Sequence, residues 1–173
     1  MTHLHYSERK SDNCETLTLL SGVTAFSKHL QLCAEQTLRT IDILSEDLDK
    51  QLFSNDRICD MFSKVARAHR QSRVRILVKK PLQLVQSYHQ LVTLQQKLSS
   101  KIEIRALNGA PENHNRCYVI FDACSLLLQH EDGQYDGFCN TQAKLEARAL
   151  LEEYELLWGR HSNAIEELRS LRL

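Results

Sequence analysis

Apolar positions recur along this chain with two alternating periods. The first helical pattern repeats every three or four residues, at Leu19, Val23, Phe26, Leu30 and Cys33. This spacing puts one apolar stripe along a helix, which we expect to begin near Thr16. Residues 38–44 then mix isoleucine and leucine with polar residues and predict a strand, and the acidic run Ser45 to Asp49 predicts the loop that closes it.

The middle of the chain repeats the order of helix and strand. Asn55 or Asp56 is a suitable N-cap for a helix with apolar residues at Ile58, Met61, Phe62 and Val65. The segment Val74–Val78 predicts a central strand, because its second half, residues 76–78, is continuously apolar, and we expect this strand to be parallel to its neighbours. Pro81 suits the first turn of a helix that we expect to continue to Leu98. Residues 102–106 alternate between apolar and charged and predict another strand.

Two short apolar runs follow, Tyr118–Phe121 and Leu126–Leu128, with the turn-forming residues 122–125 between them. They predict two strands joined by a tight turn. After a polar loop at 130–137, a long helix is predicted from near Thr141 to Gly159, with Tyr154 and Trp158 on its buried face. Asn163 followed by Glu166 suggests the capping box of a short final helix.

Strands that alternate with helices of this length favour an α/β domain. We expect a mixed sheet of about five strands flanked by helices, with Val74–Val78 in the centre and Tyr118–Phe121 beside it. The 173 residues suffice for one domain, predicted over 15–173. Residues 1–14 are polar and are predicted to be a flexible arm, in which His3 and His5 could bind a metal only weakly.

Composition restricts the function and the compartment. With 22 basic and 22 acidic side chains the net charge is zero, so no global field attracts nucleic acid or an anionic membrane. Six cysteines occur at irregular spacing without a CxxC pair, which favours reduced thiols. The N-terminus lacks the apolar core of a signal peptide, and no apolar run reaches the roughly 20 residues needed to cross a bilayer. We therefore expect a cytoplasmic protein with no membrane segment.

The stretch from Asn115 to Gln129 resembles the motif strand of the phospholipase D superfamily, whose signature is His-x-Lys-x4-Asp followed by a second strand. With Asp122 in the aspartate position, Cys117 occupies the lysine position and Asn115 the histidine position. The similarity covers residues 16–160 and implies a phospholipase D-like half-domain of a bacterial type. Because half-domains of this family pair to complete their site, the resemblance also implies a homodimer.

The residues that carry the chemistry of this family are absent. An amide such as Asn115 is not a usable nucleophile at neutral pH, and the thiol of Cys117 never carries positive charge. The downstream Gly-Ser-x-x-Asn motif is also lost, since its positions hold Gln129, His130 and Gly133. The degenerate motif therefore predicts a protein without phosphodiesterase activity.

One local charge feature stands out. Residues 67–80 contain no acidic side chain and carry seven basic or imidazole groups: Arg67, His69, Arg70, Arg73, Arg75, Lys79 and Lys80. Lys79 and Lys80 follow a predicted strand and precede a helix start, a position that favours anions. We expect them to be the main contacts of a phosphate-bearing ligand, with Arg67 and Arg70 contributing only to a long one. The alternative is a solvated surface that aids solubility.

Three functions remain open from the sequence. The first is a non-catalytic phospholipase D-like module that binds a protein partner or an anionic ligand such as phosphate or nucleic acid. The second is an accessory subunit of another enzyme, such as an acetyltransferase. The third is an enzyme of unrelated chemistry that uses Asp122, His114 or Cys117. A zinc site of His114 and Cys117 with Cys124 or Cys139 lacks the regular ligand pairs of structural zinc, so we expect neither metal nor cofactor.

Overall fold

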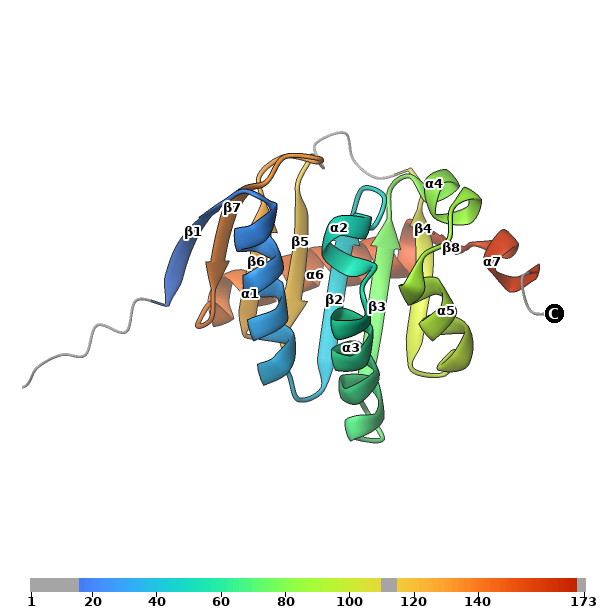
Figure 1. Ribbon diagram of the computed structural model, residues 1–173, viewed down its shortest axis with the longest axis horizontal. Coiled ribbons are helices and arrows are strands. Elements are labelled where there is room, and N and C mark those ends of the chain that lie inside the picture. The colour runs from blue at the N-terminus through green and yellow to red at the C-terminus, as the bar shows by residue number, and fades with distance from the viewer. Residues whose placement is uncertain (1–15, 110–114, 171–173) are drawn as a thin grey trace, which may run out of the picture.

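The computed structural model describes residues 16–109 and 115–170, which form one mixed sheet with helices on both faces (Figure 1). The strands are β1 Leu17–Ser21, β2 Thr40–Ser45, β3 Arg73–Val78, β4 Ile102–Leu107, β5 Cys117–Phe121, β6 Ser125–Gln129, β7 Asp136–Asn140 and β8 Ser162–Ala164. The helices are α1 Val23–Gln36, α2 Lys50–Phe53, α3 Asp56–Ala68, α4 Pro81–Gln86, α5 Gln90–Lys97, α6 Lys144–Arg160 and α7 Glu166–Ser170. The predicted class is confirmed, but the sheet has eight strands rather than five.

The strand order is β1-β7-β6-β5-β2-β3-β4-β8. The central strands β2, β3 and β4 are parallel, and every other pairing is antiparallel. We call the side of the sheet where β2, β3 and β4 end the carboxyl edge, and the side where they begin the amino edge. Because β5 is antiparallel to β2, it begins at the carboxyl edge and ends at the amino edge.

The two faces of the sheet are covered unequally. Helices α1, α3 and α5 pack on one face, while α6 runs across the strands on the other (Figure 1). Strand β5 is buried on both faces: Val119 and Phe121 join the core under α1 and α3, and Tyr118 and Ile120 join the core under α6. A strand covered on both sides is apolar at every position, which explains its continuous apolar run.

The first predicted helix is wrong at its start. Residues Leu17–Ser21 form β1, which pairs antiparallel with β7, and the helix begins only at Val23. Leu20 is buried while Leu19 is 81% exposed, as expected for a strand with one covered face. Gly22 separates the two elements with a φ of 88°, a conformation that glycine adopts without steric cost.

Other predictions also need correction. The single helix expected up to Leu98 is two helices, α4 and α5, because the buried His89 starts α5 by accepting a hydrogen bond from the amide of Leu91 at 3.1 Å. Asn163 lies in β8 and caps no helix. The strand β5 lies beside β2, which separates it from β3. Tyr154 is fully buried as expected, whereas Trp158 is only partly buried.

The local signals with a specific chemical role are confirmed. The side chain of Asn55 accepts a hydrogen bond from the amide of Ile58 at 2.9 Å and caps α3. Pro81 occupies the first turn of α4. Asp122 and Ala123 have φ values of 53° and 52° and form a tight turn between β5 and β6, since the amide of Cys124 donates to the carbonyl of Phe121 at 3.0 Å.

Candidate functional site

The three motif positions are divided between the two edges of the sheet. Asn115 and Cys117 lie at the carboxyl edge, where β5 begins, and Asp122 follows its last residue at the amino edge. Asp122 lies five positions after Cys117 along an extended chain, a distance of about 17 Å. The two positions therefore have separate surroundings and different roles.

Asp122 connects two loops. One carboxylate oxygen accepts from the amides of Arg39 and Thr40 at 2.8 and 2.9 Å, and the other accepts from the amide of Leu38 at 2.8 Å. Three amide donors bound by one carboxylate fix the start of β2 against the turn that follows β5. The contacts of Asp122 are therefore structural, as in other turns where a carboxylate binds neighbouring backbone.

At the carboxyl edge, Asp132 joins Cys117 to Lys79. The ammonium of Lys79 donates to both carboxylate oxygens of Asp132 at 2.9 Å and to the carbonyl of Arg116 at 2.8 Å. The thiol of Cys117 donates to the same carboxylate at 2.7 Å. The side chains of Lys79 and Asp132 are only 13% and 20% exposed. A lysine from the neighbouring parallel part of the sheet thus places its charge beside the position where the family signature has its own lysine.

The surroundings of Cys117 disfavour the thiolate form of its side chain. Burial, and then the hydrogen bond to Asp132, raise its pKa to about 12, and the nearby Lys79 only partly opposes them. Because the thiolate is the reactive form, a thiol with this pKa remains protonated at neutral pH. The hypothesis of an enzyme that uses Cys117 as a nucleophile has no support in this geometry.

The rest of this edge is acidic. Lys80, the second predicted anion contact, forms an ion pair with Glu46. The adjacent Asp47 and Asp49 come from the same loop between β2 and α2, and Asp49 also accepts a hydrogen bond from the hydroxyl of Tyr135. Burial, followed by repulsion from Asp49 and Glu46, raises the pKa of Asp47 above its ordinary value. The carboxylates of this edge therefore offset the charge of both lysines.

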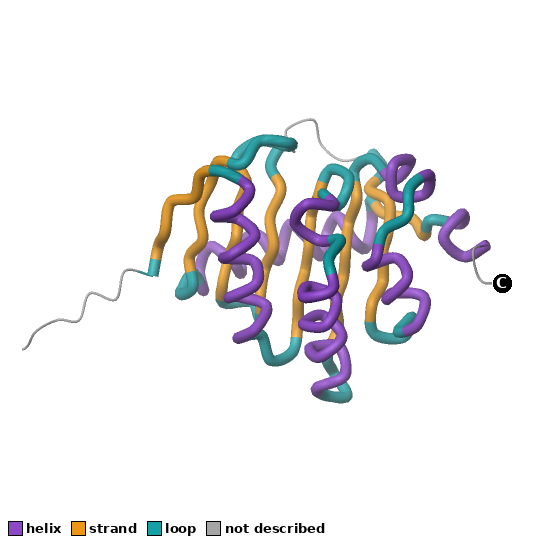
Figure 2. Tube along the Cα trace, viewed as in Figure 1, coloured by secondary structure: helices purple, strands orange, loops and turns teal. Residues whose placement is uncertain are grey.

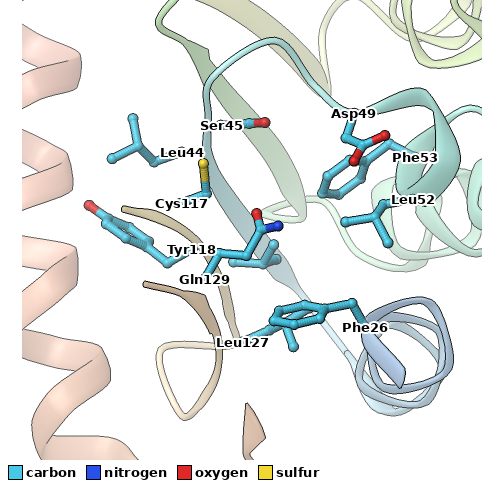
Figure 3. Close-up of a pocket in the computed structure, with 11 residues that line it drawn as sticks. Phe26, Leu44, Ser45, Asp49, Leu52, Phe53, Cys117, Tyr118, Leu127 and Gln129 are labelled. Carbon is cyan, nitrogen blue, oxygen red and sulfur yellow. The ribbon is translucent and has the colours of Figure 1, made fainter. Parts of the chain in front are cut away.

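A cavity beside Cys117 lies between α1, α2 and the strands β2, β5 and β6 (Figure 3). Its lining is mostly apolar and consists of Phe26, Leu44, Ser45, Asp49, Leu52, Phe53, Cys117, Tyr118, Val119, Leu127 and Gln129. Figure 3 shows Leu52 and Phe53 of α2 on one side of it and Cys117 and Tyr118 of β5 on the other. With a volume of about 20 Å³ it holds no more than a water molecule. Sites for organic ligands are more than ten times larger.

The predicted basic stretch does not form one site. Strand β3 carries Lys79 and Lys80 to the carboxyl edge, while Arg67 and Arg70 remain near its start at the amino edge. Six residues of strand separate the two groups by about 20 Å. A compact anion therefore cannot contact all four side chains at once.

Arg75, from the same stretch, is buried beneath α6. Its guanidinium donates to Asp42 at 2.7 Å and to both carboxylate oxygens of Glu155 at 2.7 and 3.0 Å, and it lies over the rings of Tyr154 and Trp158. Burial raises the pKa of Asp42 although Arg75 opposes it, while Arg75 lowers the pKa of Glu155. The one signal in the sequence was a charged residue inside each of two apolar strands. The network holds α6 on the sheet and leaves Arg75 inaccessible to a ligand.

The metal hypothesis finds no support in the described chain. Cys117 and Cys124 lie at opposite edges, and Cys139 contacts Cys33, with 3.5 Å between the two sulfur atoms. Within residues 16–109 and 115–170, no group of three histidine, cysteine or acidic side chains could hold a metal ion. His114, like His3 and His5, lies outside the described residues. The described helices include none that is both long and apolar enough to pass through a bilayer.

Comparison with known proteins adds a family and a fold. The family described as "Domain of unknown function (DUF7931)" matches residues 23–171, and no curated protein matches the chain. Among solved structures, TrmBL2, an archaeal chromatin protein, has a TM-score of 0.64 at 14% identity, covering 91% of this chain and 57% of that chain. NucT from Helicobacter pylori has a TM-score of 0.56 at 13% identity, covering 86% of this chain and 97% of NucT.

Phosphatidylserine synthase from Haemophilus influenzae Rd KW20 has a TM-score of 0.59 at 11% identity, covering 91% of this chain and 41% of the synthase. The chain therefore spans about half the length of TrmBL2 and of the synthase, but nearly all of NucT. NucT and the synthase belong to the phospholipase D-like superfamily, so the likeness confirms the fold of a phospholipase D-like half-domain.

Proposed function

We propose that this chain, which belongs to the DUF7931 family and has a phospholipase D-like fold, is a non-catalytic module that binds an anionic, phosphate-bearing ligand. The observation that carries the non-catalytic part of the proposal is the contact of Asp132 with both Lys79 and Cys117. The carboxylate of Asp132 accepts the hydrogen bonds that Lys79 would otherwise donate to a substrate phosphate. The site is therefore internally neutralised at the place where the family performs its chemistry.

The individual residues support the absence of catalysis. Covalent phosphoryl transfer needs a nucleophile, and Asn115 supplies only an amide. Cys117 is protonated at neutral pH, because its pKa is about 12. Lys79 has the right charge, but its ammonium is bound to the carboxylate of Asp132 and to the carbonyl of Arg116. Asp122 is about 17 Å from Cys117 and is engaged by three backbone amides.

The binding part of the proposal is supported by one structural neighbour. The structure of TrmBL2 is described as showing "a novel mode of DNA binding". The fold that TrmBL2 shares with this chain extends over 91% of the chain. A phospholipase D-like fold is therefore compatible with a binding role toward a phosphate polymer.

Two measurements test this proposal. We expect no turnover of bis(p-nitrophenyl) phosphate or DNA above the background of a mock purification. We also expect a labelled oligonucleotide to bind with an affinity that falls as salt is raised, because cations that contact phosphate release counterions. Turnover that Cys117→Ala or Lys79→Ala abolishes would refute the non-catalytic assignment. No binding of any phosphate-bearing ligand at low salt would refute the binding assignment.

Self-association is a second candidate function, and the edge strand β1 favours it. On the face opposite α1, β1 presents Leu17 and Leu19, which are 51% and 81% exposed. An exposed apolar edge strand is a template for pairing with another strand. If two copies pair through β1, sedimentation should show a dimer that Leu19→Lys converts to a monomer. A monomer at all concentrations would eliminate this candidate.

A further inference from the structure

The amino edge gathers basic side chains from three loops that are far apart in sequence. The loop between α1 and β2 supplies Arg39, the region from the last turn of α3 to the first residue of β3 supplies three arginines, and the loop between α5 and β4 supplies a lysine. All three loops lie along one side of the sheet, the lower side in Figures 1 and 2. We call these residues the amino-edge cluster: Arg39, Arg67, Arg70, Arg73 and Lys101.

Hydrogen bonds hold the three loops in register. The amide of Arg73 donates to the carbonyl of Arg39 at 3.0 Å, and the amide of Val74 donates to the carbonyl of Lys101 at 2.9 Å. The ammonium of Lys101 also donates to the carbonyls of His69 and Arg70. Arg39, Arg73 and Lys101 therefore begin three adjacent strands, which are about 4.8 Å apart. The result is a row of cationic side chains on a rigid backbone.

These charges are only partly compensated. Arg39, Arg67 and Arg70 are exposed, and within the described parts of the chain none of them forms an ion pair or a side-chain hydrogen bond. Arg73 has one carboxylate partner, Glu155, at 3.6 Å, and both side chains are 49% exposed. The neighbouring Asp122 is negative but directs its oxygens at backbone amides.

The carboxyl edge has a different balance of charge. There, Lys79 and Lys80 face carboxylates that outnumber them: Glu46, Asp47, Asp49 and Asp132. A chain with zero net charge is thus polarised across its sheet, with a cationic amino edge and an acidic carboxyl edge. The amino edge is where an anionic polymer can approach without meeting this acidic cluster.

We propose that the amino-edge cluster binds the phosphate backbone of a nucleic acid duplex, without reading its sequence. This inference rests on the proposed binding function and names its ligand and surface. Guanidinium groups form paired hydrogen bonds with phosphate oxygens, and exposed arginines can follow a repeating row of phosphates.

The chemistry around the cluster restricts the mode of binding. Residues 35–41, 67–75 and 97–103 contain no phenylalanine, tyrosine or tryptophan, so these segments offer no platform on which single-stranded bases could stack. The contacts that this row of guanidinium groups favours are those to the phosphate backbone, which position a duplex but carry no base specificity. Such binding has a dissociation constant of roughly 10⁻⁴ to 10⁻⁶ M at physiological salt.

The test is a fluorescence anisotropy titration of labelled DNA and RNA duplexes, of about 20 base pairs, at several salt concentrations. The test variant is Arg39→Ala/Arg67→Ala/Arg70→Ala. A matched control, Lys28→Ala/Lys144→Ala/Arg148→Ala, removes the same charge from exposed positions on α1 and α6. A Lys79→Ala/Lys80→Ala variant probes the carboxyl edge. Circular dichroism checks that every variant is folded.

We expect wild-type protein to bind with a slope of log affinity against log salt of about −4, as four to five phosphate contacts require. The test variant should lose at least about tenfold in affinity, and its slope should flatten by about 3. The matched control and the carboxyl-edge variant should remain within about twofold of wild type. Similar affinity for DNA and RNA duplexes would place recognition in the shared backbone.

Each other outcome has a defined meaning. Duplex binding that the test variant and the matched control weaken equally would overturn the amino-edge assignment and leave the proposed binding function intact. The same holds if only the carboxyl-edge variant loses affinity. Binding to anionic lipid vesicles but not to either duplex would overturn the choice of nucleic acid. No binding to duplexes, vesicles or pyrophosphate would refute the proposed binding function itself.

Discussion

Replacing Asp122 with alanine should destabilise the fold without removing any activity. The substitution deletes the acceptor of three amide hydrogen bonds of 2.8 to 2.9 Å, from Leu38, Arg39 and Thr40. A hydrogen bond to a charged group contributes about 1.5–3 kcal/mol when buried. Two of these amides belong to exposed residues, where water can replace the carboxylate, so we expect about 2–3 kcal/mol for the three together.

The backbone adds a second contribution. Asp122 has a φ of 53°, in the left-handed region that aspartate and asparagine tolerate better than alanine. Forcing alanine into this region costs about 1 kcal/mol more. The total for Asp122→Ala is then about 3–4 kcal/mol. Asp122→Asn keeps one acceptor oxygen and the preferred backbone, so it should cost only about 1 kcal/mol.

Urea denaturation followed by circular dichroism measures these differences through the unfolding midpoint. Ala123→Gly is the control for the turn, since Ala123 has a φ of 52° and no side-chain hydrogen bond in the described structure. Relief of its strain should stabilise the protein by about 0.5–1 kcal/mol, after the greater freedom of glycine in the unfolded chain is subtracted. If Asp122→Ala unfolds within about 1 kcal/mol of wild type, the structural role assigned to this carboxylate is wrong.

Three further predictions test the site and the packing. The rate of alkylation of Cys117 by iodoacetamide should rise up to a pH of about 12, the pKa of its thiol, and Asp132→Asn should lower that pKa. A rate that reaches a plateau below pH 9 in wild type would contradict the buried, hydrogen-bonded thiol. The pKa of Glu155 is lowered from 4.5 in the folded protein, so its ionised carboxylate stabilises the fold above that pH and loses this effect as the pH falls through the lower folded value. Glu155→Gln should therefore flatten the acid limb of a profile of unfolding free energy against pH, and an unchanged profile would count against the ion pair with Arg75. Gly137→Ala should lower the free energy of unfolding by about 3 kcal/mol or more, because the new Cβ would lie 1.8 Å from a backbone oxygen of β6. A thermal unfolding midpoint equal to that of wild type would refute this close approach.

The best-predicted elements are those whose signals lie within a few residues. Helix α3 combines an apolar stripe with a cap at Asn55, and β3, which is buried on both faces, ends in three consecutive apolar residues. The hairpin of β5 and β6 follows from two apolar runs around a turn. Strands β1, β7 and β8 could not be predicted, because they gain their stability from partners far away in the sequence, such as Asn140 for Leu17.

The candidate site also has a part that the sequence predicts and a part that only tertiary contacts decide. Asn115 and Cys117 are local facts, and from the sequence alone they predict the loss of the family's nucleophile and cation. The occupant of that place, a carboxylate between Cys117 and Lys79, depends on a contact between residues 53 positions apart. The sequence shows which residues are charged, but it does not show which residues they pair with, since Coulombic and hydrogen-bond energies depend on distance in space.

Sequence by itself determined the alternation of elements, the α/β class and the absence of a histidine-lysine pair. Tertiary structure alone decided that Lys79 is neutralised at the carboxyl edge, that Arg75 is buried, and that Arg67 and Arg70 join Arg39 at the amino edge. The physical reason is that the six residues of β3 hold the basic groups at its two ends about 20 Å apart, while the parallel sheet brings distant loops within about 5 Å of one another.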